Sequence, residues 1–294
     1  MSQYQILSLC TPIKLNLALH VVGQRDDGYH LLDSLVVFSE DGDRLIFSPA
    51  NKDKFLVNGP FADGLLNTSD NLVMRARDAL RAQFPDETPP VCITLEKKLP
   101  IASGIGGGSG NAAAALIGLC RYWQLECSFE NLLEIALSLG ADVPMCLYGM
   151  CYNKALSVHG VGEDITLLPG FPCLDIVLVN PGVKIITQDI FSNLKQKENP
   201  PLRRGAIRSL SAMIDMLSKS RNDLLAPVLE QEPIIADVIN ALDESGSQFS
   251  RMSGSGATCF GIFEDAKSAR CAAKEISQKY PNWYVLQTKT KGQL

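Results

Sequence analysis

Apolar and polar residues alternate along residues 6–22, with Ile13, Leu15, Leu17 and Leu19 on one side, and this period of two predicts a β-strand. The polar segment 23–28 then predicts a turn. Similar short apolar runs predict further strands, at 35–38, 44–47, 91–95, 174–179, 249–252, 258–263 and 283–287.

Helical spacing of apolar residues begins after Ser69 and Asp70, which are candidate caps for a helix that carries Leu72 and Val73. An alanine-rich run from Asn111 predicts a second helix, and Ser128 and Gly140 bracket a third. Three more helical stretches are predicted at 202–219, 230–243 and 266–279.

Strands and helices occur in mixed order, which predicts an α+β fold. A chain of 294 residues is longer than one average domain, and the turn-rich segment 169–172 is the best linker candidate. We therefore expect an N-terminal domain over residues 1–168 and a C-terminal domain over residues 169–294.

The composition excludes several classes of function. The net charge of −5 argues against nucleic acid or an anionic membrane surface as a partner. No apolar run approaches the roughly 20 residues of a membrane span, and the N-terminus lacks the layout of a signal peptide. The nine cysteines contain no CxxC pair, and none of the three histidines lies at zinc-site spacing from a cysteine. Reduced thiols in a cytoplasmic protein are the expectation.

A glycine-rich segment from Gly104 to Gly110 leads directly into the alanine-rich helix. Glycines allow backbone N–H groups to approach an anion closely, and a helix N-terminus adds its dipole, so the segment predicts phosphate binding. No lysine follows as in a Walker A loop, and Ser109 occupies the last glycine position of a dinucleotide fingerprint. The alternative is a flexible surface loop, which seldom runs straight into a strong helix.

Two polar residues could carry chemistry. Lys14 interrupts an apolar strand, which indicates either a functional residue or an edge strand with one face in solvent. Asp142 precedes Val143 and Pro144 and suits a helix N-cap, a role that is compatible with catalysis. A carboxylate could orient or deprotonate an acceptor hydroxyl, and a nearby lysine would neutralise charge on a transferring phosphoryl group.

A further cluster, Ser253-Gly254-Ser255-Gly256-Ala257, lies between two predicted strands. It is either a tight connection or a place where the backbone approaches a ligand.

Six segments, taken in order along the chain, resemble the GHMP kinase superfamily, which includes galactokinase, homoserine kinase and mevalonate kinase. They are Pro12–Leu17, Asp27-Gly28-Tyr29-His30, Gly106–Ser109 with Asn111-Ala112-Ala113, Gly140–Pro144, Asn222-Asp223-Leu224 and Met252–Ala257. The Asp-Gly-Tyr-His element is most similar to members that phosphorylate a cytidyl diphosphate sugar alcohol in the non-mevalonate route to isoprenoid precursors.

This resemblance implies a ribosomal protein S5 domain 2-like N-terminal domain and a ferredoxin-like C-terminal domain. It implies Lys14 and Asp142 as the catalytic pair, with ATP and Mg²⁺ as co-substrate and cofactor; the magnesium ligands are not implied. The substrate residues would be Asn16, Tyr29, His30 and Phe191. The ATP-binding residues would be Asn71 near the adenine and, along the loop, Pro100, Ile101, Ala102, Ser103, Gly104, Ile105, Gly106, Gly107, Gly108, Ser109 and Gly110. The enzyme would act as a monomer or weak homodimer.

The chain departs from the family pattern at Gly110, where a second serine is expected after Ser109. Two other kinds of protein compete with this interpretation. A GHMP kinase for a different alcohol need not carry Asp27-Gly28-Tyr29-His30, and a catalytically dead relative should lack Lys14 or Asp142.

Overall fold

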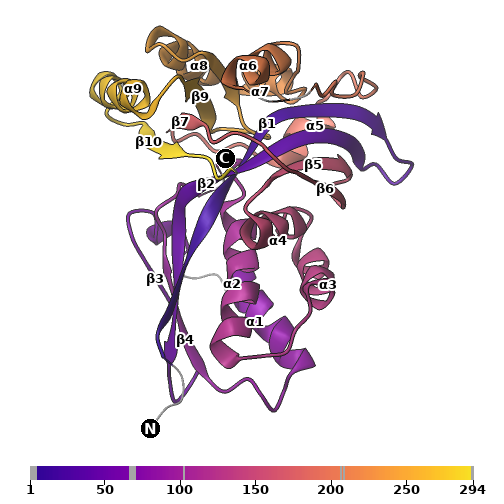
Figure 1. The fold of residues 1–294 in the computed structure, drawn as a ribbon, viewed down its shortest axis with the longest axis vertical. Helices are drawn as coiled ribbons and strands as arrows, with labels where there is room; N and C mark the ends of the chain where they lie inside the picture. Colours follow the sequence, from indigo (N-terminus) through magenta and orange to yellow (C-terminus); the bar gives the residue numbers. More distant parts are fainter. Residues whose placement is uncertain (1–4, 66–70, 102, 206, 208, 293–294) are drawn as a thin grey trace. The chain divides into compact units, whose positions relative to one another are not determined.

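The computed structural model describes residues 5–65, 71–101, 103–205, 207 and 209–292 (Figure 1). The chain forms two compact units that interleave along the sequence. The first contains residues 1–13, 41–101 and 106–152, and the second contains residues 14–40, 102–105 and 153–294. Strands β1 (Leu7–Gln24) and β2 (His30–Pro49) contribute residues to both units.

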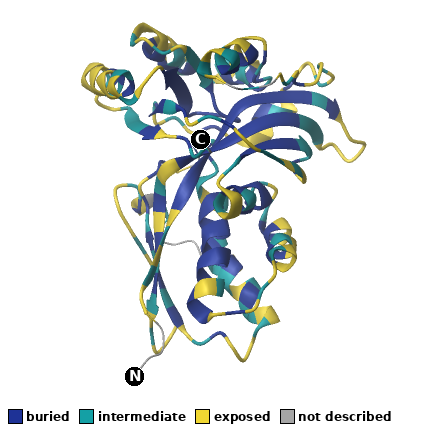
Figure 2. Cartoon of the chain, viewed as in Figure 1, coloured by how far each residue is buried: buried dark blue, intermediate teal, exposed yellow. Residues whose placement is uncertain are grey.

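The first unit combines a small sheet with a group of helices. Strand β4 (Val91–Glu96) pairs in parallel with β3 (Lys54–Asn58) and antiparallel with the end of β2, where Arg44 lies opposite Glu96. The helical elements are η1 (Asp63–Leu65), α1 (Leu72–Gln83), α2 (Gly107–Trp123), α3 (Phe129–Leu139) and α4 (Val143–Tyr152). Helix α2 packs against α1, α3 and α4 and is buried over most of its length (Figure 2). This position explains its run of small alanines, because only short side chains let several helices approach it closely.

The second unit contains a four-stranded antiparallel sheet in the order β10-β7-β9-β8. Its strands are β7 (Asp175–Asn180), β8 (Phe249–Met252), β9 (Cys259–Phe263) and β10 (Tyr284–Lys289). Helices α8 (Ile234–Glu244) and α9 (Ala266–Lys279) pack against this sheet and bury Val238, Leu242 and Ile276 with Val177 and Val179.

The other elements of this unit surround the N-terminal strands. Strand β5 (Ala155–Gly160) pairs with the first part of β2 and with β6 (Asp164–Leu168). Three helices complete it: α5 (Thr187–Ser192), α6 (Leu210–Ser218) and α7 (Leu225–Gln231). No helix among the described residues is both long and apolar enough to cross a membrane.

The predicted α+β class is confirmed, as are the first strand, the third helix and the last helix. Three predictions were wrong in detail. The segments 35–38 and 44–47 belong to one long strand, β2, and helix α2 begins at Gly107, before Asn111. The C-terminal helices divide differently, with α6 starting at Leu210 and α7 ending before Pro233.

The cap of α1 was also assigned to the wrong residue. Its N-cap is Asn71, whose side chain accepts a hydrogen bond from the Val73 amide, whereas Ser69 and Asp70 lie outside the described residues. Strands β3, β5 and β6 and helix α5 were not predicted, whereas the start of α4 directly after Asp142 was. The division into domains at residue 168 stays a prediction.

Candidate active site

Strand β1 carries three buried polar residues in the second unit, Lys14, Asn16 and His20. Lys14 is 5% exposed and Asn16 4% exposed, and every residue from Thr11 to His20 is buried. The alternative of an edge strand with one face in solvent is therefore wrong. The Lys14 amide donates to the Ile105 carbonyl at 3.2 Å, which ties this strand to the glycine-rich segment.

The Asn16 side chain is held in one orientation by hydrogen bonds that do not involve its side-chain oxygen. Its amide nitrogen donates to the Ser34 hydroxyl at 2.8 Å, and that hydroxyl donates to the Ala18 carbonyl at 2.7 Å. Asn16 Oδ1 is buried and accepts no hydrogen bond from any described residue. A buried acceptor without a donor is costly, so this atom is ready for a hydroxyl or N–H group of a ligand.

The cluster Ser253–Ala257 follows β8 and makes a tight connection to β9, as one of the two interpretations predicted. The Ser253 hydroxyl accepts a hydrogen bond from the backbone N–H of Asn16 at 3.0 Å. The backbone N–H of Thr258 donates to the Ser103 carbonyl at 3.2 Å. Gly104 has φ of +71°, and a Cβ on it would lie 2.1 Å from the Gly256 carbonyl oxygen. The connection thus packs directly against the segment 103–105, and its contact with a ligand stays a prediction.

Asn222 holds this connection in place. Its side-chain amide donates to the carbonyls of Met252 and Gly254, both at 2.8 Å, and its oxygen accepts from the Leu224 amide at 3.1 Å. The next residue, Asp223, accepts from the Val21 amide of β1 at 2.8 Å. The Asn-Asp-Leu motif therefore links β1 to the connection that contacts Asn16.

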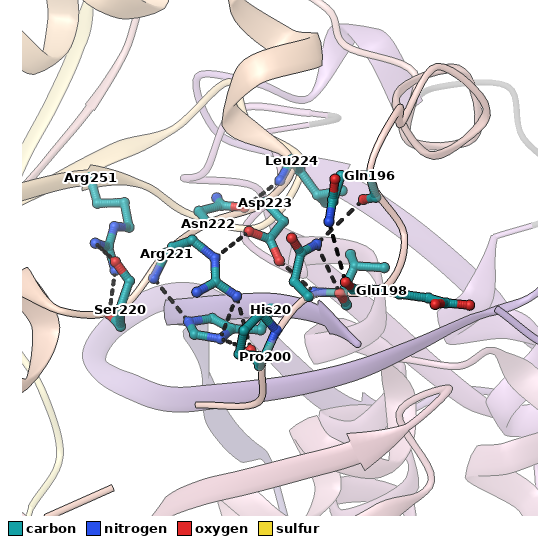
Figure 3. Close-up of polar contacts among 12 residues, drawn as sticks. His20, Gln196, Glu198, Pro200, Ser220, Arg221, Asn222, Asp223, Leu224 and Arg251 are labelled. Carbon is teal, nitrogen blue, oxygen red and sulfur yellow. Dashed lines mark hydrogen bonds and ion pairs between the residues drawn. The ribbon is translucent and has the colours of Figure 1, made fainter. Parts of the chain in front are cut away.

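His20 lies beside the same motif and requires a neutral imidazole. Its Nε2 accepts from the Arg221 amide at 2.9 Å, so the proton is on Nδ1, which lies 3.0 Å from the Pro200 carbonyl oxygen (Figure 3). Burial, more than the nearby Arg221 guanidinium, lowers the pKa of His20 below its ordinary value of 6.5. Protonation of Nε2 would remove the acceptor for the Arg221 amide.

We expect this histidine to make the fold sensitive to acid. Below about pH 6.5 His20 binds a proton in the unfolded chain but stays neutral in the folded chain. The free energy of unfolding should therefore fall as the pH drops toward the lower pKa of the folded state. In His20→Gln, which does not titrate, urea unfolding at pH 7.5 and pH 5.5 should show a smaller loss of stability on acidification than in the wild type. Equal losses in the two proteins would contradict this role.

Helix α2 presents an open N-terminus in the first unit. Its N-cap, Gly106, has a left-handed backbone and makes no side-chain cap hydrogen bond. The first N–H groups of a helix lack intrahelical acceptors, and here they fall on Gly107, Gly108 and Ser109. A Cβ on Gly107 would lie 3.4 Å from the Lys97 ammonium and one on Gly108 3.7 Å from a Leu72 methyl, and beyond the helix itself no backbone atom of the described residues lies within 4 Å of either position. The arrangement suits an anion.

The remaining loop residues divide between the two units. Pro100 and Ile101 belong to the first unit and Ser103, Gly104 and Ile105 to the second, while Ala102 lies outside the described residues. Gly110 is buried in the first turn of α2, and a Cβ there would lie 3.4 Å from the Pro12 carbonyl oxygen. Glycine instead of serine therefore allows close contact between α2 and the start of β1.

Asp142 lies directly before α4, and its carbonyl accepts the Cys146 amide at 3.2 Å. This is the N-cap position that the Asp-x-Pro spacing predicted. Its side chain is half-buried. Asp142 belongs to the first unit and Lys14 to the second, and their pairing in catalysis stays a prediction.

Asn71 has a structural task that the sequence did not reveal. Its side-chain oxygen caps α1 by accepting the Val73 amide at 2.9 Å. Its predicted contact with adenine stays a prediction, and the side-chain nitrogen is the group that could make it.

The structure brings two predicted substrate residues together in the second unit. The rings of His30 and Phe191 lie 5.1 Å apart at an angle of 33°. His30 Nε2 is buried and has no hydrogen-bond partner among the described residues. Burial, reinforced by the Lys197 charge, lowers the pKa of His30, so its ring is neutral at pH 7. Tyr29 directly precedes His30, in the exposed turn that contains Asp27 and Gly28, and it is 63% exposed.

Sequence reasoning missed several residues that support the loop. Asp43 pairs with Lys97, and Asn111 bonds to both Asp43 and Thr11, so these four residues form a buried cluster in the first unit. Asp43 lies in the polar stretch 39–44 and Lys97 lies between Glu96 and Lys98, so the local sequence does not indicate that either residue is buried.

Comparison with known proteins places these features in a family. Residues 71–150 match the GHMP kinases N terminal domain, and residues 199–282 match the GHMP kinases C terminal domain. The chain is 52% identical over 284 residues to a 4-diphosphocytidyl-2-C-methyl-D-erythritol kinase of Bartonella bacilliformis, covering 96% of this chain and 93% of that one. It is 48% identical to the protein of the same name from Brucella melitensis, covering 94% and 92%.

Solved structures show the same relationship. A crystal structure of 4-(cytidine 5'-diphospho)-2C-methyl-D-erythritol kinase superposes with a TM-score of 0.80 at 28% identity, covering 98% of this chain and all of the other. Homoserine kinase from Cytophaga hutchinsonii, at 15% identity and a TM-score of 0.70 over 99% and 97% of the chains, shares the fold. On this sequence identity and this two-domain fold, the chain belongs to the GHMP kinase family.

Proposed function

We propose that this chain transfers the γ-phosphoryl group of ATP to the 2-hydroxyl of 4-diphosphocytidyl-2-C-methyl-D-erythritol, a step of the non-mevalonate route to isoprenoid precursors. The name that its relatives carry, at about half identity over nearly the whole chain, supports the reaction. The observation that carries the choice of substrate is the buried, unpartnered Nε2 of His30 beside the ring of Phe191. The proposed setting is the cytoplasm, with a monomer or weak homodimer that uses neither nucleic acid nor a membrane.

His30 and Phe191 suit the cytosine of this substrate. A nucleobase offers a flat face for stacking and a polar edge for hydrogen bonds, and an aromatic ring beside an unpartnered nitrogen provides both. Because His30 is neutral, its two ring nitrogens are one donor and one acceptor. The exposed ring of Tyr29 is available for the second face of the base.

The nucleotide would bind by its phosphates at the start of α2. The uncapped N–H groups of Gly107, Gly108 and Ser109 and the positive end of the helix dipole supply a field for anions without a Walker lysine. This explains how a chain with net charge −5 binds ATP.

The chemistry would fall to Lys14, Asn16 and Asp142. The acceptor hydroxyl oxygen attacks the γ-phosphorus while its proton passes to the Asp142 carboxylate, and the bond between the γ-phosphorus and the bridging oxygen breaks to release ADP. Lys14 would balance the charge on the transferring group, and the free Asn16 Oδ1 would accept a hydrogen bond from a hydroxyl of the sugar alcohol.

Mg²⁺ would accompany ATP rather than occupy a site of its own. The described residues contain no group of three or more potential metal-binding His, Cys, Asp or Glu side chains. This fits magnesium, which is usually held by one or two carboxylates together with substrate phosphates. The Ser109 hydroxyl, at the start of α2, would help to hold it, and the ion would neutralise phosphate charge.

An assay of ADP release tests the reaction. Purified protein with ATP and magnesium should turn over the cytidyl substrate and leave mevalonate, homoserine and galactose unused. Turnover of one of those alcohols in preference would assign the chain to another member of the family.

Substitutions in the cytosine site provide a sharper test. Tyr29→Ala, Phe191→Ala and His30→Ala should each reduce kcat/KM for the cytidyl substrate, with a nearly unchanged KM for ATP. Loss of a stacked ring should cost about 1–3 kcal/mol of binding free energy. His30→Ala should also reduce discrimination between cytidyl and uridyl analogues, because unpaired polar groups reject the wrong base. Losses that fall on ATP would place these rings in the nucleotide site.

A further inference from the structure

Asp43 bonds to residues that flank the glycine-rich segment on both sides, all of them in the first unit. It lies on β2 with no exposed surface. Its Oδ1 accepts the amides of Lys98 and Leu99, at 2.7 and 2.9 Å, where the chain leaves β4 and enters the segment. Its Oδ2 accepts the side-chain amide of Asn111, in the first turns of α2, at 3.0 Å. One carboxylate therefore contacts the chain on both sides of the proposed phosphate site.

Asn111 is fixed at both ends of its side chain. It is 3% exposed, and besides donating to Asp43 it accepts a hydrogen bond from the Thr11 hydroxyl of β1 at 2.8 Å. Thr11 is 1% exposed. The start of α2 is thus held in one position relative to both strands, because no water competes for these bonds.

Lys97 supplies the charge that keeps Asp43 paired. Its ammonium forms an ion pair with Asp43 Oδ2, and the lysine is 3% exposed. Burial lowers the pKa of Lys97, and the Asp43 charge opposes this. The ammonium also lies 3.4 Å from where a Cβ of Gly107 would be, so a positive charge adjoins the positive end of α2. Asp43 balances that repulsion, so the helix N-terminus still favours an anion.

We propose that Asp43, with Asn111 and Thr11, is a positioning unit that sets the spacing of the backbone N–H groups for the phosphates of ATP. These residues do not touch the nucleotide; they act through the loop and the start of α2. Backbone donors bind phosphate well only when they are pre-arranged, and a displacement of about 1 Å can cost two orders of magnitude in rate. The inference rests on the proposed function of the loop.

Thr11 gives the cleanest test because its substitution preserves shape. In Thr11→Val the hydroxyl is lost at nearly constant volume, and in Asn111→Ala the link from α2 to Asp43 is lost. We expect both to raise the Kd of ATP, measured by calorimetry without the second substrate, and the KM for ATP by about tenfold. The KM for the cytidyl substrate should change less than about twofold. Thr11→Ser, which keeps the hydroxyl, should recover most of the loss.

Asp53 provides a matched control in the same unit. Its carboxylate accepts the Val91 amide at 3.0 Å, at the opposite end of β4, and pairs with Arg81 of α1. Asp53→Asn should therefore lower the melting temperature without changing the Kd of ATP. If Thr11→Val and Asn111→Ala lose stability as Asp53→Asn does but bind ATP normally, Asp43 and its partners are only structural and the inference fails. A wild-type protein that binds no ATP would overturn the inference together with the proposed function.

Discussion

Asp142→Asn is expected to fold normally and to lose turnover by about a hundredfold or more, as for other general bases. The substitution keeps the size of the side chain and its ability to cap α4, since asparagine is as good an N-cap as aspartate. It removes the negative charge that would receive the proton of the acceptor hydroxyl. The loss should therefore appear in kcat, measured by ADP release at saturating substrates, with little change in either KM.

Asp265 allows capping to be separated from catalysis. It caps α9 in a capping box, with its side chain accepting the Ser268 amide at 2.8 Å, and it lies on the surface of the second unit. Asp265→Asn should leave kcat at the wild-type level, and circular dichroism should show both variants folded. Near-normal turnover by folded Asp142→Asn would reduce Asp142 to a structural cap.

The sequence predicted most clearly those elements whose signals are local. The strand around Lys14 followed from its period of two, and the third helix from Ser128 and Gly140, which the structure confirms as its N-cap and C-cap. The catalytic candidates followed from a resemblance of motifs, because nothing in the local pattern distinguishes a catalytic Asp142 from a helix cap.

Features that depend on distant contacts were missed or misinterpreted. Residues 39–43 separate the two predicted strands 35–38 and 44–47, yet β2 continues through them. Gly42 is needed because a Cβ there would lie 1.8 Å from the Thr11 carbonyl oxygen, so it marks a close approach of two strands rather than a turn. The neighbouring Asp43 is buried by residues 54 to 68 positions away, a partnership that no local pattern reveals.

The start of α2 shows the same limit. Glycines disfavour a helix, so the pattern predicted its beginning at Asn111. The structure starts it at Gly107, since the bonds of Asn111 to Asp43 and Thr11 and the burial of α2 hold the first turn in place. Tertiary contacts here outweigh a propensity of roughly 1 kcal/mol per glycine.

Gly104→Ala is expected to reduce kcat/KM for both substrates more than a hundredfold. Its φ of +71° is unfavourable for alanine, and the new Cβ would lie 2.1 Å from the Gly256 carbonyl oxygen and 2.7 Å from the Gly256 carbonyl carbon. Both are backbone atoms, so no side chain can rotate away and the segment 103–105 must move. That movement would disturb the bond from the Lys14 amide to the Ile105 carbonyl and hence the strand that carries Lys14 and Asn16.

Two other glycines of the second unit turn this into a graded test. Gly246 has φ of +88° with nothing within 4 Å of its Cβ position, so Gly246→Ala carries only the backbone strain, about 1–2 kcal/mol. A Cβ on Gly254 would lie 3.1 Å from the Gly104 carbonyl oxygen and 3.2 Å from Asn16 Oδ1, so its neighbours must yield by a few tenths of an ångström. Activity per folded molecule should therefore fall in the order Gly246→Ala, Gly254→Ala, Gly104→Ala, with stability followed by thermal melting. Gly254→Ala keeps the test valid if Gly104→Ala does not fold. If its activity matches that of Gly246→Ala, the packing of Gly104 against the connection between β8 and β9 does not control the position of Asn16.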